Sequence, residues 1–412
     1  MLGTDIIMCP ISNFEILTKG SKFMSLYQIA LTGGPCAGKS SALKNIKRHL
    51  EKKKYKVIVV EETATESIMS GIPPWEVDVE PFQELVISRS INKAETTLRV
   101  TDTWKRDVVI IYDRGLADCL AYMPQDMYKD TLKKFGLTPR DARDQYDLVI
   151  HMVTAADGAE EAYTCGNNKA RKETPEQARE LDTKTRNAWS GHHHLVVIDN
   201  STGFQKKLKR VRDAIDHIIS GEEYQRKWLI KKPSLEQIAS LDGVVSENIN
   251  QAYIKTPSYD LEERVRKIGD EISESSFSYS YKRGDNPGVR HSINTSISFE
   301  TYLSKLSQGR RVISQKRSWF FYKHQYFRLD CYNKKGCCDI LKEDEAILEI
   351  DLVSRNAEVI LPDWVHVIRE VTAEPEYANK NLARELNGFE RAKSKLTQIL
   401  WSLAKRLGRY MY

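Results

Sequence analysis

The chain has 412 residues, 41% of them hydrophobic and 29% charged, which predicts a folded protein of two domains and a tail. Its net charge of +6 suits anionic ligands but is too small to indicate nucleic-acid binding, so we expect no nucleic-acid partner. The seven cysteines lack CxxC spacing, which predicts that there is no zinc site. The sequence has no apolar window of the roughly 18 to 20 residues that span a membrane and no secretory signal, so we expect a cytoplasmic protein.

Residues 1–24 form an extension, and residues 25–220 then alternate short apolar runs with helical stretches. This alternation is typical of βα units on a parallel sheet. The predicted strands are Tyr27–Leu31, Lys56–Glu61, Asp107–Tyr112, Leu148–Val153 and Leu195–Asp199. The predicted helices are Ser41–Lys53, Phe82–Thr103 and Gln205–Ile219. Because the strands are almost continuously apolar, we expect both faces of the sheet to be buried.

The loop between the first strand and the first helix matches the GxxxxGK[ST] phosphate-binding pattern. Its predicted nucleotide-binding residues are Gly33, Gly34, Pro35, Cys36, Ala37, Gly38, Lys39, Ser40 and Ser41. The glycines let backbone N–H groups surround the phosphates, and the helix presents the positive end of its dipole. We expect Lys39 to neutralise phosphate charge and Ser40 to ligate Mg²⁺, the predicted cofactor. A glycine turn matches the pattern by chance at times, but the strand–loop–helix order favours a nucleotide site.

Two of the predicted strands end in carboxylates. Asp113 follows the strand 107–112, where we expect it to complete the Mg²⁺ shell. Glu61 and Glu62 end the strand 56–61, and Glu62 is a candidate catalytic base for a substrate hydroxyl. Acids in such places are also common as helix N-caps, which is the alternative for both sites.

A basic stretch at residues 169–172 lies between the fourth and fifth strands. In nucleoside and nucleotide kinases, a lid in this position supplies arginines that stabilise the transferring group, which makes Arg171 a catalytic candidate. Glu173 and Glu176 interleave with the basic residues, so a solvated helix face is an equal alternative. We expect His192–His194 to serve in packing or phosphate contact rather than in metal binding.

The first half resembles the small P-loop kinase-like family that includes the ATPase domain of the bifunctional nicotinamide-nucleotide enzymes. The resemblance rests on residues 31–41, 60–62 and 112–115, and extends over roughly residues 25–220. It implies a P-loop NTPase sandwich around a parallel sheet.

From residue 221 to 412 the hydrophobic pattern changes to period two, which predicts antiparallel strands. These strands are Arg226–Ile230, Asn248–Tyr253, Glu263–Ile268, Ser276–Lys282, Val312–Tyr322, Gln325–Tyr332 and Ala346–Leu352. Charged residues at alternate positions would face solvent in a sandwich or line the lumen of a closed barrel. A final helix is expected at Asn381–Tyr410.

The opening of this half resembles the first strand of the CYTH domain, the fold of triphosphate tunnel metalloenzymes. Glu223, Gln225 and Lys227 stand where that family has Glu-x-Glu-x-Lys. The resemblance implies an antiparallel barrel whose lumen binds polyphosphate through cations and divalent ions through carboxylates. The cationic candidates are Lys227, Arg264, Arg266, Lys282, Lys316 and Arg328. The metal-binding candidates are Glu223, Glu349 and Asp351. Because Gln225 removes a carboxylate, we expect a better anion receptor than hydrolase.

A P-loop domain followed by a CYTH-like barrel resembles the TRPL translocation defect protein family over nearly the whole chain; plant uridine kinase-like proteins share the order more loosely. The closer resemblance implies binding of GTP or ATP, contact with phosphoinositide headgroups, peripheral membrane contact and a role in membrane protein traffic. No Asn-Lys-x-Asp motif separates guanine from adenine. Two alternatives remain: a small-molecule kinase fused to a triphosphatase or pyrophosphatase, and a GTP-dependent adaptor without useful catalysis.

Overall fold

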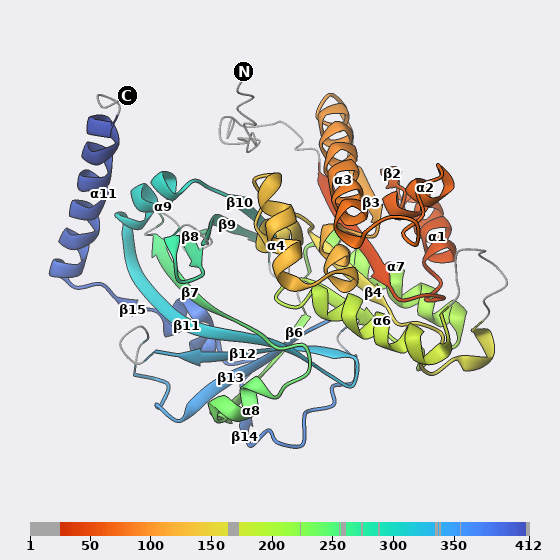
Figure 1. Ribbon diagram of the computed structural model, residues 1–412. Coiled ribbons are helices and arrows are strands. Elements are labelled where there is room, and N and C mark those ends of the chain that lie inside the picture. Colours follow the sequence, from red (N-terminus) through yellow and green to blue (C-terminus); the bar gives the residue numbers. More distant parts are fainter. Residues whose placement is uncertain are drawn as a thin grey trace.

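The computed structural model describes residues 25–163, 173–222, 224–254, 256, 261–272, 275–286, 289–333, 337, 339–354 and 356–408. Of residues 282–286, 289–294 and 401–408 only the backbone is described. The described chain folds into two sheets, a parallel one in the first half and an antiparallel one in the second (Figure 1). The predicted fold class, a parallel P-loop sheet followed by an antiparallel sheet, is confirmed.

The first sheet has five parallel strands in the order β2-β3-β1-β4-β5. They are β1 (Leu26–Gly33), β2 (Lys56–Val60), β3 (Val108–Asp113), β4 (Leu148–Met152) and β5 (Leu195–Ile198). All five predicted strands are present, with ends shifted by three residues or fewer. Because β1 is central and the strands are parallel, the carboxyl ends of β2 and β3 lie at the same edge of the sheet as the phosphate loop. Ligands of open parallel sheets commonly bind at this edge.

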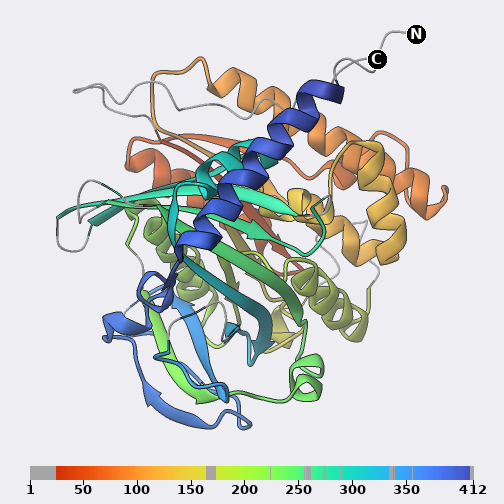
Figure 2. The ribbon, with the colours of Figure 1, turned by 90° about the vertical axis from the view of Figure 1, so that its left-hand side faces the viewer.

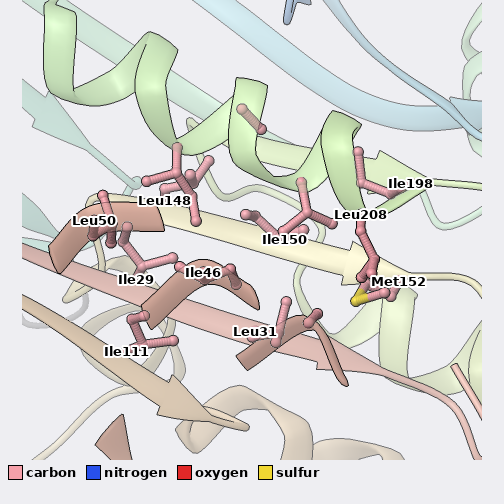
Figure 3. Packing of buried hydrophobic residues seen from close by; sticks show 14 of the residues in the cluster. Ile29, Leu31, Ile46, Leu50, Ile111, Leu148, Ile150, Met152, Ile198 and Leu208 are labelled. Atoms are coloured by element: carbon pink, nitrogen blue, oxygen red, sulfur yellow. The ribbon is translucent and has the colours of Figure 1, made fainter. Parts of the chain in front are cut away.

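Helices cover both faces of this sheet. They are α1 (Lys39–Lys52), α2 (Thr63–Met69), α3 (Val79–Thr101), α4 (Gln125–Lys134), α5 (Pro139–Asp144), α6 (Pro175–Ala188) and α7 (Phe204–Ser220), with 3₁₀ turns η1 (Leu116–Tyr122) and η2 (Glu160–Ala162). On one face, Ile46 and Leu50 of α1 and Leu208 of α7 pack over Ile29 and Ile150 of the sheet (Figure 3). Burying such side chains contributes about 1.5–3 kcal/mol each, so this layer holds the loop before α1 firmly.

The opposite face of the parallel sheet shares its hydrophobic core with the second sheet. Trp189, which follows α6, lies in one cluster with Trp319, Phe321 and Tyr326 of the second sheet. The Tyr326 hydroxyl donates to the backbone oxygen of His192 at 3.1 Å and accepts from the Gly191 N–H at 2.7 Å. The two halves therefore pack as one body across a buried apolar interface.

The second sheet is antiparallel and has ten strands, nine of them in the order β10-β9-β8-β7-β11-β12-β13-β6-β14, with β15 paired to β11. They are β6 (Tyr224–Lys231), β7 (Val245–Ile254), β8 (Leu261–Ile268), β9 (Ser276–Asn286), β10 (Val289–Ser296), β11 (Gly309–Tyr322), β12 (Gln325–Tyr332), β13 (Glu345–Leu352), β14 (Val367–Glu370) and β15 (Arg384–Glu385). The sheet curls strongly (Figure 2), but in the described residues no ladder joins β10 to β14. It is an open, barrel-like sheet.

Short helices fill the connections of this half: α8 (Leu235–Ala239), α9 (Phe299–Leu306), the 3₁₀ turn η5 (Pro375–Tyr377) and α10 (Asn379–Leu382). The final helix α11 spans Gly388–Gly408 and begins seven residues later than predicted. The reason is that Arg384–Glu385 pairs as a strand with β11 first. No helix of the described chain combines the length and hydropathy needed to cross a membrane.

The shared core predicts that the halves stabilise one another. Phe321 is 2% exposed and lies 4.9 Å from the Tyr326 ring and 4.3 Å below the Arg186 guanidinium. Phe321→Ala should therefore lower the free energy of unfolding by about 3–5 kcal/mol. Phe389→Ala, at a side chain that is 78% exposed, is the matched control and should change it by less than about 0.5 kcal/mol. Denaturant titration followed by tryptophan fluorescence measures the free energy of unfolding of both variants. An equally small decrease in the two variants would contradict the shared core.

Candidate functional site

The phosphate loop has the backbone that its sequence predicts. Gly33 and Gly38 have φ values of 145° and 90°, in the region that favours glycine, and Cys36 has a φ of 57°. The N–H of Gly34 donates to Asp182 Oδ1 at 2.6 Å. A Cβ at Gly34 would lie 2.6 Å from the same oxygen, so α6 can approach the loop this closely only at a glycine.

Lys39 lies at the start of α1 with its Nζ 3.4 Å from the Gly33 backbone oxygen. Burial and the neighbouring Arg114 guanidinium lower the pKa of Lys39, and the carboxylates of Glu62 and Asp113 oppose that shift. Two cations thus face three carboxylates, those of Glu62, Asp113 and Asp118, at the edge where a triphosphate would place its charge. This charge distribution is suited to binding a phosphate together with a divalent metal ion.

Asp113 ends β3 beside the loop. Its Oδ1 is buried and has no hydrogen-bond partner in the described part of the protein. Burial raises the pKa of Asp113, while the charge of Lys39 lowers it. A buried carboxylate oxygen without a partner is costly, and a Mg²⁺ ion would satisfy it. The residues present therefore fit the predicted metal, with Ser40 and Asp113 as the groups that would hold it.

Glu62 lies opposite Asp113 and forms an ion pair with Arg114, whose Nε is 2.5 Å from Glu62 Oε1. Burial raises the pKa of Glu62, but Arg114 and Lys39 outweigh it and hold the pKa at about 2. Glu62 precedes α2 without a side-chain cap bond to the backbone, so the N-cap alternative does not describe its carboxylate. Arg114 itself has a φ of 72°, a conformation that costs a non-glycine residue free energy and that tends to occur at functional sites.

A cavity of about 610 Å³ opens beside these charged groups. One wall carries Lys39, Glu62, Asp113 and Arg114, and the rest is largely apolar. The apolar and aromatic lining includes Ile68, Trp75, Phe82, Val86, Tyr122 and Leu181. Sequence reasoning located the charged wall but missed this cavity, because α2, α3 and η1 build it from residues that form no motif.

Several predicted residues lie elsewhere or outside the described residues. Arg171, the predicted lid arginine, and Glu223, a predicted metal ligand, fall outside the described residues, and only the backbone of Lys282 is described, in β9. Arg186, a basic residue that follows the stretch 169–172 along the chain, does not face the phosphate loop: its NH2 is 2.5 Å from Asp242 Oδ2. Asp144, His192 and His193 lie close enough to hold a metal ion.

The hydrogen bonds of His192 argue against that metal site. Its Nε2 is 2.9 Å from the Tyr146 backbone oxygen, and its Nδ1 accepts from the His194 N–H at 3.1 Å. Both ring nitrogens are thus engaged with the backbone. Asp144 is also paired, with Arg143 Nε 2.6 Å from its Oδ1. The packing role predicted for the histidine triplet agrees with the geometry of His192.

A second charged site lies on one face of the antiparallel sheet. Register sets Lys227 opposite Glu349, Glu349 opposite Arg328, and Gln251 opposite Arg266, so these side chains share a face. Lys227 Nζ is 2.7 Å from Glu349 Oε1, and both guanidinium NH groups of Arg328 are 2.7 Å from Asp351. These contacts bring together four of the predicted lumen residues: Lys227, Arg328, Glu349 and Asp351.

Lys316 does not belong to this cluster. It is exposed on the opposite face of β11, because its neighbours Gln315 and Arg317 are the residues that point to the charged face. Arg317 is the cation that sequence reasoning missed: it is 9% exposed and makes two 2.6 Å bonds to Asp330. A one-residue shift in the assumed strand phase explains the error, since neighbouring side chains point to opposite faces.

The cluster holds more positive charge than its carboxylates neutralise. The Arg266 guanidinium donates only to the Gln251 side-chain oxygen, at 3.2 and 3.3 Å, and in the described residues it has no ion pair. Burial and the charges of Arg264 and Arg317 lower the pKa of Arg266 well below its usual range. Nearby on β11, both side-chain polar atoms of Gln315 are buried without hydrogen-bond partners in the part of the chain described. The face is therefore short of an anion.

The fold and the loop geometry define a P-loop nucleotide-binding domain in the first half of the chain. Residues 28–207 match the AAA_28 family, described as an AAA domain. No curated protein matches the chain. A crystal structure of the inorganic triphosphatase NE1496 is 23% identical over 40% of this chain and 97% of that one, with a TM-score of 0.29. A second structure, described as the hypothetical protein NE1496, is 22% identical over 39% of this chain and 97% of that one, with a TM-score of 0.28.

TM-scores this low do not support an argument about the fold. The description of the second sheet therefore rests on its own strand order and register. The resemblance to the TRPL translocation defect protein family stays a prediction.

Lys39 should dominate nucleotide affinity. Lys39→Ala removes a charged hydrogen-bond donor worth about 1.5–3 kcal/mol, so the Kd for Mg²⁺-GTP or Mg²⁺-ATP should rise roughly 10- to 150-fold. Lys44→Ala, at an exposed lysine on the same helix, is the control for net charge. Calorimetric titration of each nucleotide measures the difference. Unchanged affinity in the Lys39 variant would show that the nucleotide binds elsewhere.

Proposed function

We propose that the chain is a Mg²⁺-dependent purine-nucleotide-binding protein whose second domain binds a polyanion, either a polyphosphate or a phosphoinositide headgroup. The observation that carries the second part is the half-buried Arg266 guanidinium, which among the described residues donates only to the neutral Gln251 side chain. A phosphate group supplies the missing negative charge and accepts several hydrogen bonds at once. The Gln315 amide, which has no hydrogen-bond partner in the described part of the chain, offers a further donor to the same ligand.

The charged face favours binding over hydrolysis. A metal-dependent phosphatase needs carboxylates that are open to a divalent ion. Here Glu349 is paired with Lys227, Asp351 with Arg328, and Asp330 with Arg317. The pKa of Glu349, which burial raises, is brought down to about 2 by Lys227, Arg328 and Arg317, so the carboxylate stays charged and paired. A polyanion entering this face meets cations first, which supports a receptor.

The receptor is tested by removing the unpaired charge. Arg266→Met should weaken tripolyphosphate binding about 10-fold or more, because it deletes a charge-assisted donor. The same variant should leave the free energy of unfolding without ligand unchanged or slightly higher, since a half-buried charge without an ion-pair partner in the described residues is replaced by apolar volume. Lys316→Met removes one positive charge from the opposite face of β11, two strands away from Arg266, and is the matched control.

Calorimetry with tripolyphosphate and, separately, a soluble inositol phosphate distinguishes the two sources of the anion. Tripolyphosphate binding that is equal in wild type and the Arg266 variant, with lower stability in the variant, would contradict the receptor. Equal losses in both variants would mean that net charge alone governs binding.

The cavity beside the phosphate loop favours a second candidate function, phosphoryl transfer to a small alcohol. An acceptor in the cavity would place its hydroxyl near Glu62 and Lys39. The hydroxyl oxygen would bond to the γ-phosphorus as the bond to the β–γ bridging oxygen breaks, and its proton would pass to Glu62. Glu62 is then released from its pair with Arg114, whose guanidinium becomes available to the transferred phosphoryl group. The aromatic lining suits a ring-bearing alcohol such as a nucleoside.

This candidate predicts a loss of transfer without a loss of binding. Glu62→Gln should slow labelling of a ribonucleoside from γ-labelled GTP or ATP by about 10²–10⁴-fold, while nucleotide affinity changes little. Glu61→Gln, at the exposed neighbouring carboxylate, should leave the rate near that of the wild type. No labelled product from any of the common ribonucleosides, with nucleotide binding intact, would exclude this acceptor class.

A further inference from the structure

The C-terminal helix α11 lies at the edge of the second domain, far from the parallel sheet (Figure 1). Its start is fixed by two contacts: Asn387 Oδ1 accepts from the Glu390 N–H at 2.9 Å, and Arg384 pairs with the Glu390 carboxylate at 2.6 Å. The helix then contacts α9 and runs across the side of the domain (Figure 2). It is thus a defined surface element with one long side open to its surroundings.

The open side of α11 is the apolar one. Phe389, Leu396, Ile399 and Leu400 are 78%, 55%, 55% and 57% exposed. Arg391, Ser394 and Gln398, at helical spacing on the other side, are half-buried toward the domain. A helix on the surface of a globular protein normally shows the reverse arrangement, with its apolar stripe toward the core. An exposed apolar stripe of this length indicates an interaction surface, which a partner protein or a membrane covers.

The charges of α11 identify the occupant. Its basic residues are Arg391, Lys393, Lys395, Lys405 and Arg406, against Glu390 as its one acid. Lys393 and Lys395 are exposed, next to the apolar stripe. A second copy of the chain would bring two such cationic helices together, which like charges disfavour. An anionic lipid surface accepts both the apolar stripe and the lysines, and attracts each basic residue by about 1 kcal/mol.

We propose that α11 is an interfacial membrane-binding helix that lies flat on an anionic lipid surface. Its 21 residues span roughly 30 Å along the surface. Phe389, Leu396 and Leu400 enter the boundary between headgroups and acyl chains, and the lysines contact lipid phosphates. This inference does not rest on the proposed polyanion site, because an apolar stripe needs a bilayer and not a soluble headgroup.

Vesicle flotation tests the proposal with two charge-matched variants. Leu400→Glu interrupts the apolar stripe, and Thr397→Glu adds the same charge at an exposed polar position one turn away. The probe is vesicles of phosphatidylcholine with phosphatidylserine and without phosphoinositide, so that headgroup capture by the second sheet does not contribute. We expect the wild type and the Thr397 variant to float, and the Leu400 variant to lose at least tenfold in partitioning.

Three outcomes would overturn the proposal. The first is wild-type protein that does not bind these vesicles at low salt. The second is equal loss in the two variants, which would show charge attraction without insertion. The third is a wild-type dimer in sedimentation that Leu400→Glu dissociates, which would make a second copy the occupant. Tripolyphosphate affinity, measured in parallel, separates these outcomes from a failure of the polyanion receptor.

Discussion

Helix α6 connects the phosphate loop to the second sheet. Asp182 accepts the Gly34 N–H of the loop and the Thr154 N–H after β4, at 2.6 and 3.1 Å. One turn later, Arg186 pairs with Asp242 and stacks on Phe321 of the second domain. The backbone of the loop therefore depends on a helix that the second sheet holds from its other end. The shared core around Trp189 makes this connection rigid, since buried side chains pack densely and transmit small displacements.

The two charged sites differ in how far their charges balance. At the phosphate loop, Lys39 and Arg114 face Glu62, Asp113 and Asp118, and the unpartnered oxygen of Asp113 is suited to a cation. On the second sheet Glu349, Asp351 and Asp330 are held in ion pairs, and among the described residues Arg266 has none. A charge that is partly shielded from water and has no counter-charge is destabilising. The first site thus calls for a metal and a phosphate together, and the second for an anion alone.

Most of the first site followed from the sequence because its geometry is local. The motif Gly33–Ser41 sets its own backbone, and Asp113 and Glu62 reach it because parallel strands end at one edge. The pairing of Glu62 with Arg114 was not predictable, since it depends on the left-handed backbone of Arg114. In the second half, seven of the ten strands were predicted, and β10, β14 and β15 were not. The pattern also did not fix which residues of β11 face the charged side, so Lys316 was chosen in place of Arg317. The outward apolar face of α11 also needed the structure, because helical periodicity alone does not say which side meets solvent.

The central claim is that one rigid body carries two separate phosphate-sized anion sites. Diffraction at the tungsten absorption edge, from crystals of the full chain soaked in tungstate, tests this claim directly because tungstate has the size and charge of a phosphate group. The account predicts two anomalous peaks, one within the loop of residues 33–40 and one beside Arg266 and Gln315. A peak in the loop without one on the second sheet would contradict the account and leave that sheet as a scaffold.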